Sequence, residues 1–234
     1  MHGAAKDRRA DTDFAVADDL IQISSGQWVI AADDTLTPRA QREGSIVIET
    51  EIRDLPAVRA LRPGDVVLDI GGYVGDTCAL FQSLGCEVWA FEPYPDAFEC
   101  MRRNCPGAHL VNAAVGDGRP VQAGGVFGNE TSNYAMRMVS PGGTPSLRID
   151  DLNLSRVDFV KMDIEGFEPA ALDGMTRTIE RFKPPMLIEV YNCLLTKHSF
   201  TRDDVLDRLR AHGYSWRVVG DERESRCDLM CVAK

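Results

Sequence analysis

The stretch Val66–Gly75, VVLDIGGYVG, decides the fold of this chain. Its apolar half, 66–70, is typical of a strand that is covered on both faces of a sheet. The glycines that follow predict a tight turn that lets a ligand approach the backbone. Asp76–Leu84 then predicts a helix whose first N–H groups face that turn. The sequence therefore predicts a ligand-binding unit of strand, turn and helix.

This turn differs from a dinucleotide-binding turn, which normally has the order G-x-G-x-x-G. Here Asp69 precedes the glycines. An acid at that place would repel a pyrophosphate, but it would not repel a ligand that carries an ammonium and a sulfonium. The turn therefore favours S-adenosylmethionine over NAD, and an NAD-linked oxidoreductase is the alternative. The predicted cofactor-binding residues of the turn are Asp69, Gly71, Gly72, Tyr73 and Gly75.

Two later segments extend the predicted cofactor site. Glu92 and Pro93 follow the second predicted strand, where an acid can accept hydrogen bonds from both ribose hydroxyls of an adenosine. Ala114 and Val115 end the third predicted strand, at the edge where we expect the adenine to pack. The purely structural alternatives are that Asp69 caps the helix and that Glu92 is a solvated strand end.

Acidic residues gather at 161–168, KMDIEGFE, where a further buried strand ends. We expect Asp163 to face the transferred methyl group or the amine of the cofactor. Lys161 could pair with an acid and hold it ionised. The dipole of a helix also favours acids at its start. We interpret Glu168 in this structural way, and for Glu165 this interpretation is as good as a functional one.

Transfer of a methyl group to an alcohol requires a base, because the hydroxyl must lose its proton. The candidates are, in order, Asp163, Glu165 and His198. His198 can take a proton near neutral pH, although an exposed loop histidine is an equally good interpretation. Asp163, Glu189 and Asn192 together could instead hold a divalent cation, since hard oxygen ligands suit Mg²⁺.

The rest of the chain alternates strands and helices, which predicts a mostly parallel α/β sheet with helices on both faces. A final strand pair joined by a polar turn predicts an antiparallel edge. We divide the chain into an N-terminal extension, 1–59, and a cofactor-binding domain, 60–234. Strands are predicted at 27–32, 45–49, 66–70, 87–91, 109–115, 120–127, 133–139, 157–162, 186–191, 215–219 and 227–232. Helices are predicted at 51–62, 76–84, 95–104, 169–182 with a break near Gly174, and 201–212.

Composition narrows the classes of partner. The chain has 234 residues and a net charge of −10, which argues against nucleic-acid and anionic-lipid partners. No apolar run reaches the roughly 18 residues that a membrane helix needs, and the N-terminus has no signal-peptide pattern. The seven cysteines show no CxxC spacing and are interpreted as reduced thiols of a cytoplasmic protein.

Six segments resemble, in the family's order, the FkbM family of S-adenosylmethionine-dependent methyltransferases over roughly residues 60–192. They are VVLDIGGYVGDTCALF, VWAFEPYPDAFECMRRN, VNAAVGD, LRIDDL, VDFVKMDIEGFEPAALDGM and PPMLIEVYN. The resemblance implies a Rossmann-like class I methyltransferase fold with a seven-stranded sheet. It also implies O-methylation of hydroxyls on sugars, glycans or polyketide-type small molecules.

The chain departs from the family pattern at one place in the glycine turn. The family usually has Gly-Ala-Asn-x-Gly, whereas Tyr73 stands here in place of the asparagine. A methyltransferase-like subunit that binds without catalysing is therefore a third hypothesis.

Overall fold

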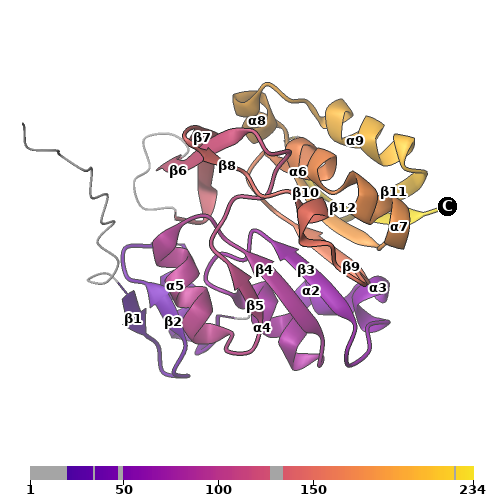
Figure 1. Cartoon of the computed structure of the whole chain (residues 1–234). Helices are drawn as coiled ribbons and strands as arrows, with labels where there is room; N and C mark the ends of the chain where they lie inside the picture. Colours follow the sequence, from indigo (N-terminus) through magenta and orange to yellow (C-terminus); the bar gives the residue numbers. More distant parts are fainter. Residues whose placement is uncertain (1–19, 34, 47–49, 127–133, 224) are drawn as a thin grey trace, which may run out of the picture.

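The computed structural model describes residues 20–33, 35–46, 50–126, 134–223 and 225–234. At its centre lies a seven-stranded sheet with the order β11-β12-β10-β9-β3-β4-β5 (Figure 1). The strands from β10 to β5 run parallel, whereas β12 runs antiparallel to β10 and β11. The strands are β3 (Val66–Ile70), β4 (Glu87–Phe91), β5 (His109–Val111), β9 (Phe159–Met162), β10 (Met186–Tyr191), β11 (Tyr214–Arg223) and β12 (Arg226–Ala233).

This sheet confirms the predicted fold class. The antiparallel strand was expected at the edge, and it lies one position inside, because β11 pairs with its outer side. The helices that flank the sheet are α4 (Asp76–Ser83), α5 (Pro95–Asn104), α6 (Glu168–Gly174), α7 (Thr176–Phe182) and α9 (Arg202–Ala211).

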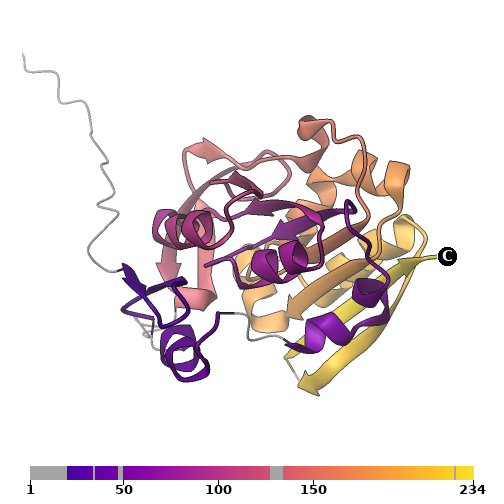
Figure 2. The ribbon, with the colours of Figure 1, turned by 90° about the horizontal axis from the view of Figure 1, so that it is seen from below.

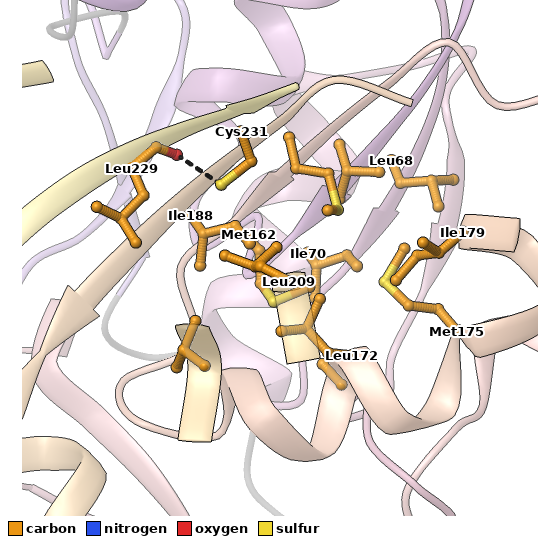
Figure 3. Close-up of a cluster of buried hydrophobic side chains, with 14 of the residues drawn as sticks. Leu68, Ile70, Met162, Leu172, Met175, Ile179, Ile188, Leu209, Leu229 and Cys231 are labelled. Atoms are coloured by element: carbon orange, nitrogen blue, oxygen red, sulfur yellow. Dashed lines mark hydrogen bonds between the residues drawn. The ribbon is translucent and has the colours of Figure 1, made fainter. Parts of the chain in front are cut away.

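Alternate residues of β3 supply the two hydrophobic layers. Val67 packs in a cluster with residues of α4 and α5. Its neighbours Leu68 and Ile70 belong to a second cluster, with residues of α6, α7 and α9. Figure 3 shows this second layer, with Leu172 and Leu209 from two helices close to the sheet. Because side chains alternate along a strand, a continuous apolar strand needs helices on both faces.

Most of the predicted elements occur where the sequence places them. Strands β3, β4 and β10 and helix α5 have the predicted bounds. Thr201 caps α9 in a capping box with Asp204. The helix predicted at 169–182 is divided after Gly174, where a Cβ would lie 1.9 Å from the carbonyl oxygen of Gly116.

In the N-terminal unit, residues 20–46, the strand predicted at 27–32 occurs, shortened at both ends, whereas a second strand and a helix were not predicted. Strands β1 (Leu20–Gln22) and β2 (Trp28–Ile30) form an antiparallel pair, and α1 (Leu36–Glu43) follows. The unit lies beside α5, on the side away from the C-terminal strands (Figures 1 and 2). The predicted strand at 45–49 is wrong for Ser45 and Ile46, and its remaining residues lie outside the described ranges.

Two other elements differ from the prediction. Strand β5 ends at Val111 instead of 115, because the Asn112 side chain donates to the carbonyl oxygen of Glu92 (2.7 Å) and the chain turns toward the ligand-binding edge. The strands predicted at 120–127 and 133–139 belong to a small separate sheet of β6 (Pro120–Val126), β7 (Arg137–Pro141) and β8 (Thr144–Pro145). The second prediction is wrong for Tyr134–Met136, which form a 3-10 helix, and residues 127 and 133 lie outside the described ranges.

The short helices α2 (Thr50–Asp54) and α3 (Pro56–Arg59) lead into the main sheet, as expected for 51–62. The domain boundary near residue 60 stays a prediction. Among the described residues, no helix has the length and apolar character needed to cross a membrane.

Candidate active site

A pocket of about 370 Å³ lies at the carboxyl ends of the parallel strands. Its floor comes from the ends of β3, β4 and β9 and from the residues after β5. Residues of α1 and of the segment that leads into β7 complete its lining. Parallel α/β sheets bind ligands at this edge, and the volume falls in the range of roughly 300–1,000 Å³ that is usual for small-molecule sites.

The glycine turn fits tightly against the end of β9. Gly71 has a φ of +88°, and a Cβ there would lie 1.9 Å from the carbonyl oxygen of Asp163. Lys161 Nζ donates to the carbonyl oxygen of Gly71 (3.2 Å), which ties the turn to the acidic cluster. Gly71 lines the pocket. Gly72 packs against Met101 of α5, and Gly75 packs against Met101 and against Cys105, which follows α5.

Asp69 is completely buried and lies behind the turn. The hydroxyl of Thr77 lies 2.9 and 2.8 Å from its two carboxylate oxygens. Asp69 does not line the pocket, so its effect on a ligand would pass through the position of the turn and the first turn of α4.

Glu92 forms the opposite side of the cofactor floor. Its carboxylate accepts hydrogen bonds from the backbone N–H groups of Tyr73 (3.0 Å) and Tyr94 (2.8 Å). Burial raises the pKa of Glu92 to about 7, although these hydrogen bonds oppose the shift. Each carboxylate oxygen has a second lone pair for a ligand hydroxyl. Pro93, Ala114 and Val115 also line the pocket, as predicted for cofactor-binding residues.

Tyr73 links the glycine turn to the N-terminal unit. Its hydroxyl donates to Asp33, a residue that is only 1% exposed. Asp33 in turn accepts from the backbone N–H groups of Thr35 and Leu36 at the start of α1. Tyr73 has a φ of +46°, which is unusual for a residue with a side chain. This hydroxyl contact helps to hold the turn in place.

Three carboxylates crowd together beyond the ends of β9 and β10. Asp163, Glu165 and Glu189 each place an oxygen within 4.8 Å of the others. Burial and the charge of Asp163 raise the pKa values of Glu165 and Glu189 well above the usual range. Two cations moderate the repulsion, since Lys161 lies 3.5 Å from Asp163 and Arg226 pairs with Glu189.

The chemistry of this cluster suits a cation. Oxygen ligands of this kind could hold Mg²⁺ or the ammonium group of a ligand. The predicted cation ligands were Asp163, Glu189 and Asn192, and the structure adds Glu165 to the first two. The side-chain oxygen of Asn192 is buried without a hydrogen-bond partner. Asp163 and Glu165 line the pocket, whereas Glu189 lies behind them.

His198 and Glu168 lie next to this cluster. A ring N–H of His198 donates to the backbone of Glu165, burial lowers its pKa, and its Nε2 is buried without a partner. The ring packs against Phe167 (5.2 Å between centroids), which lines the pocket, although His198 does not. Glu168 Oε1 accepts from two backbone N–H groups, of Ile164 and Gly166 (both 3.1 Å), which fits the structural role expected of it.

Comparison with known proteins identifies the family. Residues 69–216 match the family model described as the methyltransferase FkbM domain. The chain belongs to this family. The matched segment contains the glycine turn, Glu92 and the acidic cluster. Membership in a methyltransferase family counts against the NAD-linked alternative.

A curated relative shares only part of its sequence with this FkbM family protein. It is 29% identical over 128 residues to the hexuronic acid methyltransferase AglP of Haloferax volcanii. The match covers 50% of this chain and 52% of AglP, so the chain spans about half the length of this curated relative.

A solved structure supports the class I methyltransferase fold. A TehB-like SAM-dependent methyltransferase from Corynebacterium glutamicum gives a TM-score of 0.51 at 14% identity, over 84% of this chain and 93% of that one. A methyltransferase FkbM from Methylobacillus flagellatus gives 0.49 at 20% identity, over 74% of this chain and 45% of that one.

Several pocket residues of the FkbM family chain were not predicted. Thr35, Leu36 and Arg39 come from α1, and Arg137 comes from β7. These residues belong to no recognisable motif, and they reach the pocket only through long-range packing. The one available signal was the aromatic and basic character of 134–137, Tyr-Ala-Met-Arg, after a polar loop.

Proposed function

We propose that this protein is an S-adenosylmethionine-dependent methyltransferase that methylates a hydroxyl on a sugar, glycan or polyketide-type small molecule. The observation that carries the proposal is a single pocket that joins the glycine turn and Glu92 to the crowded acids at Asp163. Membership in the FkbM methyltransferase family supports the reaction. The likeness to a hexuronic acid methyltransferase supports a sugar acceptor.

The pocket residues fit S-adenosylmethionine. Glu92 is fixed by two backbone N–H groups and can still accept from the ribose hydroxyls. Ala114 and Val115 offer an apolar wall for the adenine. Gly71 brings the backbone close to the methionine part, and Asp163 offers a carboxylate to its ammonium. When bound, this cofactor supplies an activated methyl group.

The residues of the chain have two tasks in the transfer. The first is alignment, since the pocket must hold the acceptor oxygen in line with the methyl group and exclude water. The second is removal of the hydroxyl proton, for which Asp163, Glu165 and His198 remain the candidates. Asp163 and Glu165 both line the pocket, whereas His198 does not. Lys161 pairs with Asp163 and favours its ionised form, while burial and the charge of Asp163 raise the pKa of Glu165, so Asp163 is the favoured base.

The acceptor enters from the side lined by α1 and β7 in this proposal. A small molecule or a glycan end fits a pocket of about 370 Å³ better than a folded macromolecule does. The net charge of −10 supports an acceptor other than nucleic acid or a membrane surface.

The test is a methyl-transfer assay on a panel of sugars, uronic acids and polyketide alcohols with Asp163→Ala. We expect turnover at saturating cofactor to fall by at least about 100-fold, as for loss of a general base. Asp203→Ala, an exposed acid on α9, is the matched control and should keep wild-type turnover. Unchanged turnover in Asp163→Ala would remove its proposed role. Cofactor binding without turnover on any acceptor would favour the non-catalytic hypothesis.

A further inference from the structure

Arg137 is held in a rigid position on the wall of the pocket. Its side chain is only 10% exposed, and Nη1 donates to Asp96 at 2.9 Å. Nε donates to the carbonyl oxygen of Tyr134 at 3.0 Å. The guanidinium lies 4.1 Å from the ring centroid of Tyr94 and 4.7 Å from that of Tyr134. Contacts on two nitrogens and two rings leave this side chain little freedom to move.

The third nitrogen of this guanidinium, Nη2, is buried and has no hydrogen-bond partner among the residues that the structure describes. A buried charged donor without a partner is costly, so a stable protein normally satisfies it with a group of its own or with a ligand. Arg137, Tyr94 and Tyr134 all line the pocket. A ligand in the pocket is therefore the natural partner of Nη2.

The cofactor does not supply an anion to this end of the pocket. S-adenosylmethionine carries a single anionic group, the carboxylate of its methionine part, and the proposed site places that part beside Gly71. Arg137 stands at the other end, because it pairs with Asp96 and lies over the ring of Tyr94, shortly after Glu92 in the chain. Lys161 and Arg226 are the cations that pair with acids of the other cluster. The second ligand of the pocket, the acceptor, remains.

We propose that Arg137 binds a carboxylate on the acceptor, so that the protein selects acidic sugars over their neutral counterparts. This inference rests on the proposed function and names the acceptor class. Guanidinium and carboxylate form charge-assisted hydrogen bonds, which are the strong ones. Asp96 already accepts from Nη1 of this guanidinium, so Nη2 is the nitrogen that can donate to one further carboxylate. The two tyrosine rings offer flat apolar faces to a sugar ring.

The experiment measures binding of simple probes to the full chain saturated with S-adenosylhomocysteine, by saturation-transfer NMR. The probes are D-glucuronate, D-glucose and glucose 6-phosphate. We expect the wild type to bind glucuronate at least tenfold more tightly than glucose. Arg137→Gln should lose that preference while its affinity for S-adenosylhomocysteine stays within twofold of the wild type.

Two further variants complete the design. Arg137→Lys keeps the charge but not the planar contacts, and it should retain part of the preference. Arg181→Gln is the control, because Arg181 also lies over an aromatic ring, that of Phe182, but outside the pocket lining. It should behave as the wild type.

Three results would overturn the inference. They are equal binding of glucuronate and glucose by the wild type, tighter binding of glucose 6-phosphate than of glucuronate, and loss of S-adenosylhomocysteine affinity as the main effect of Arg137→Gln. The wild-type selectivity decides the matter even where Arg137→Gln does not fold. Absence of S-adenosylhomocysteine binding by the wild type would instead overturn the proposed function.

Discussion

Two groups of buried acids meet at the pocket, and they differ in how their oxygens are satisfied. Behind and beside the glycine turn, Asp69 and Glu92 receive hydrogen bonds from a hydroxyl and from two backbone N–H groups. Beyond β9 and β10, Asp163, Glu165 and Glu189 repel one another, and an oxygen of Glu165 is buried without a partner. The carboxylates of the first group therefore have hydrogen-bond donors within the protein, whereas the second group keeps a buried oxygen without a donor among the described residues.

The difference indicates two kinds of task. Hydrogen bonds from rigid backbone groups hold a carboxylate where a ligand hydroxyl can find it, which suits recognition of the cofactor. Crowded carboxylates with raised pKa values are typical of sites that bind a cation or move a proton. We therefore expect substitutions in the first group to change cofactor affinity and substitutions in the second to change turnover.

The largest effect on affinity is expected from Glu92→Gln. A glutamine must turn its NH₂ group toward one of the two backbone N–H groups that now donate to Glu92, and it also loses a charged acceptor. We predict that calorimetry will show a loss of about 10–100-fold in affinity for S-adenosylhomocysteine, as for a hydrogen bond to a charged group.

Glu87→Gln is the control for this change, because Glu87 begins the strand that Glu92 follows and its side chain is 50% exposed. Its affinity should equal that of the wild type. An unchanged affinity in Glu92→Gln would show that the first group does not recognise the cofactor.

A smaller effect is expected from Tyr73→Phe. This variant removes the hydroxyl that donates to Asp33 but leaves the backbone N–H that donates to Glu92. Since the turn loses one anchor and keeps its shape, we predict a loss of about 3–10-fold in S-adenosylhomocysteine affinity. Asp33→Asn should give a similar loss. An effect of Tyr73→Phe on turnover alone would contradict the assignment of Tyr73 to the first group.

Glu168 sharpens the comparison, because it lies beside the second group but accepts backbone hydrogen bonds like the first. Burial raises its pKa from 4.5 to about 7. The folded state therefore holds a proton that the unfolded state has released, and Glu168's contribution to stability falls as the pH rises from about 4.5 to about 7.

Glu168→Gln cannot titrate and keeps an oxygen for the two N–H groups. We predict that the free energy of unfolding of the wild type falls between pH 5 and pH 7 by about 2 kcal/mol more than that of the variant. Urea denaturation at both pH values measures this difference. Parallel changes in the two proteins would show that Glu168 does not titrate in this window.

The sequence was most informative where local pattern determines structure. A continuous apolar run defined β3, all of whose residues are buried, because a strand covered on both faces has no solvent-exposed side. Shorter apolar runs with one charged residue each were enough to define β4 and β10. In the N-terminal unit the strand at 27–32 was predicted, but β1, α1 and the packing of the unit against α5 were not. This packing depends on contacts such as the paired hydrogen bonds between Trp28 and Asn104, which are 76 residues apart and leave no mark in a local pattern.

The same distinction applies to the site. Motifs named Glu92 and Asp163, which follow strands, and both line the pocket. Arg137 lies outside any motif, and its free nitrogen is visible only once Tyr94 and Tyr134 are seen around it. The sequence shows which chemical groups are present. Which of their atoms have hydrogen-bond partners is seen only in the folded structure.

Calorimetric titration of S-adenosylhomocysteine into the full chain, beside NAD as a control, tests the central claim most directly. The account predicts one binding site per chain for S-adenosylhomocysteine, a strong loss of affinity in Glu92→Gln, and no heat with NAD. A folded wild-type protein that binds NAD, or that does not bind S-adenosylhomocysteine, would contradict it.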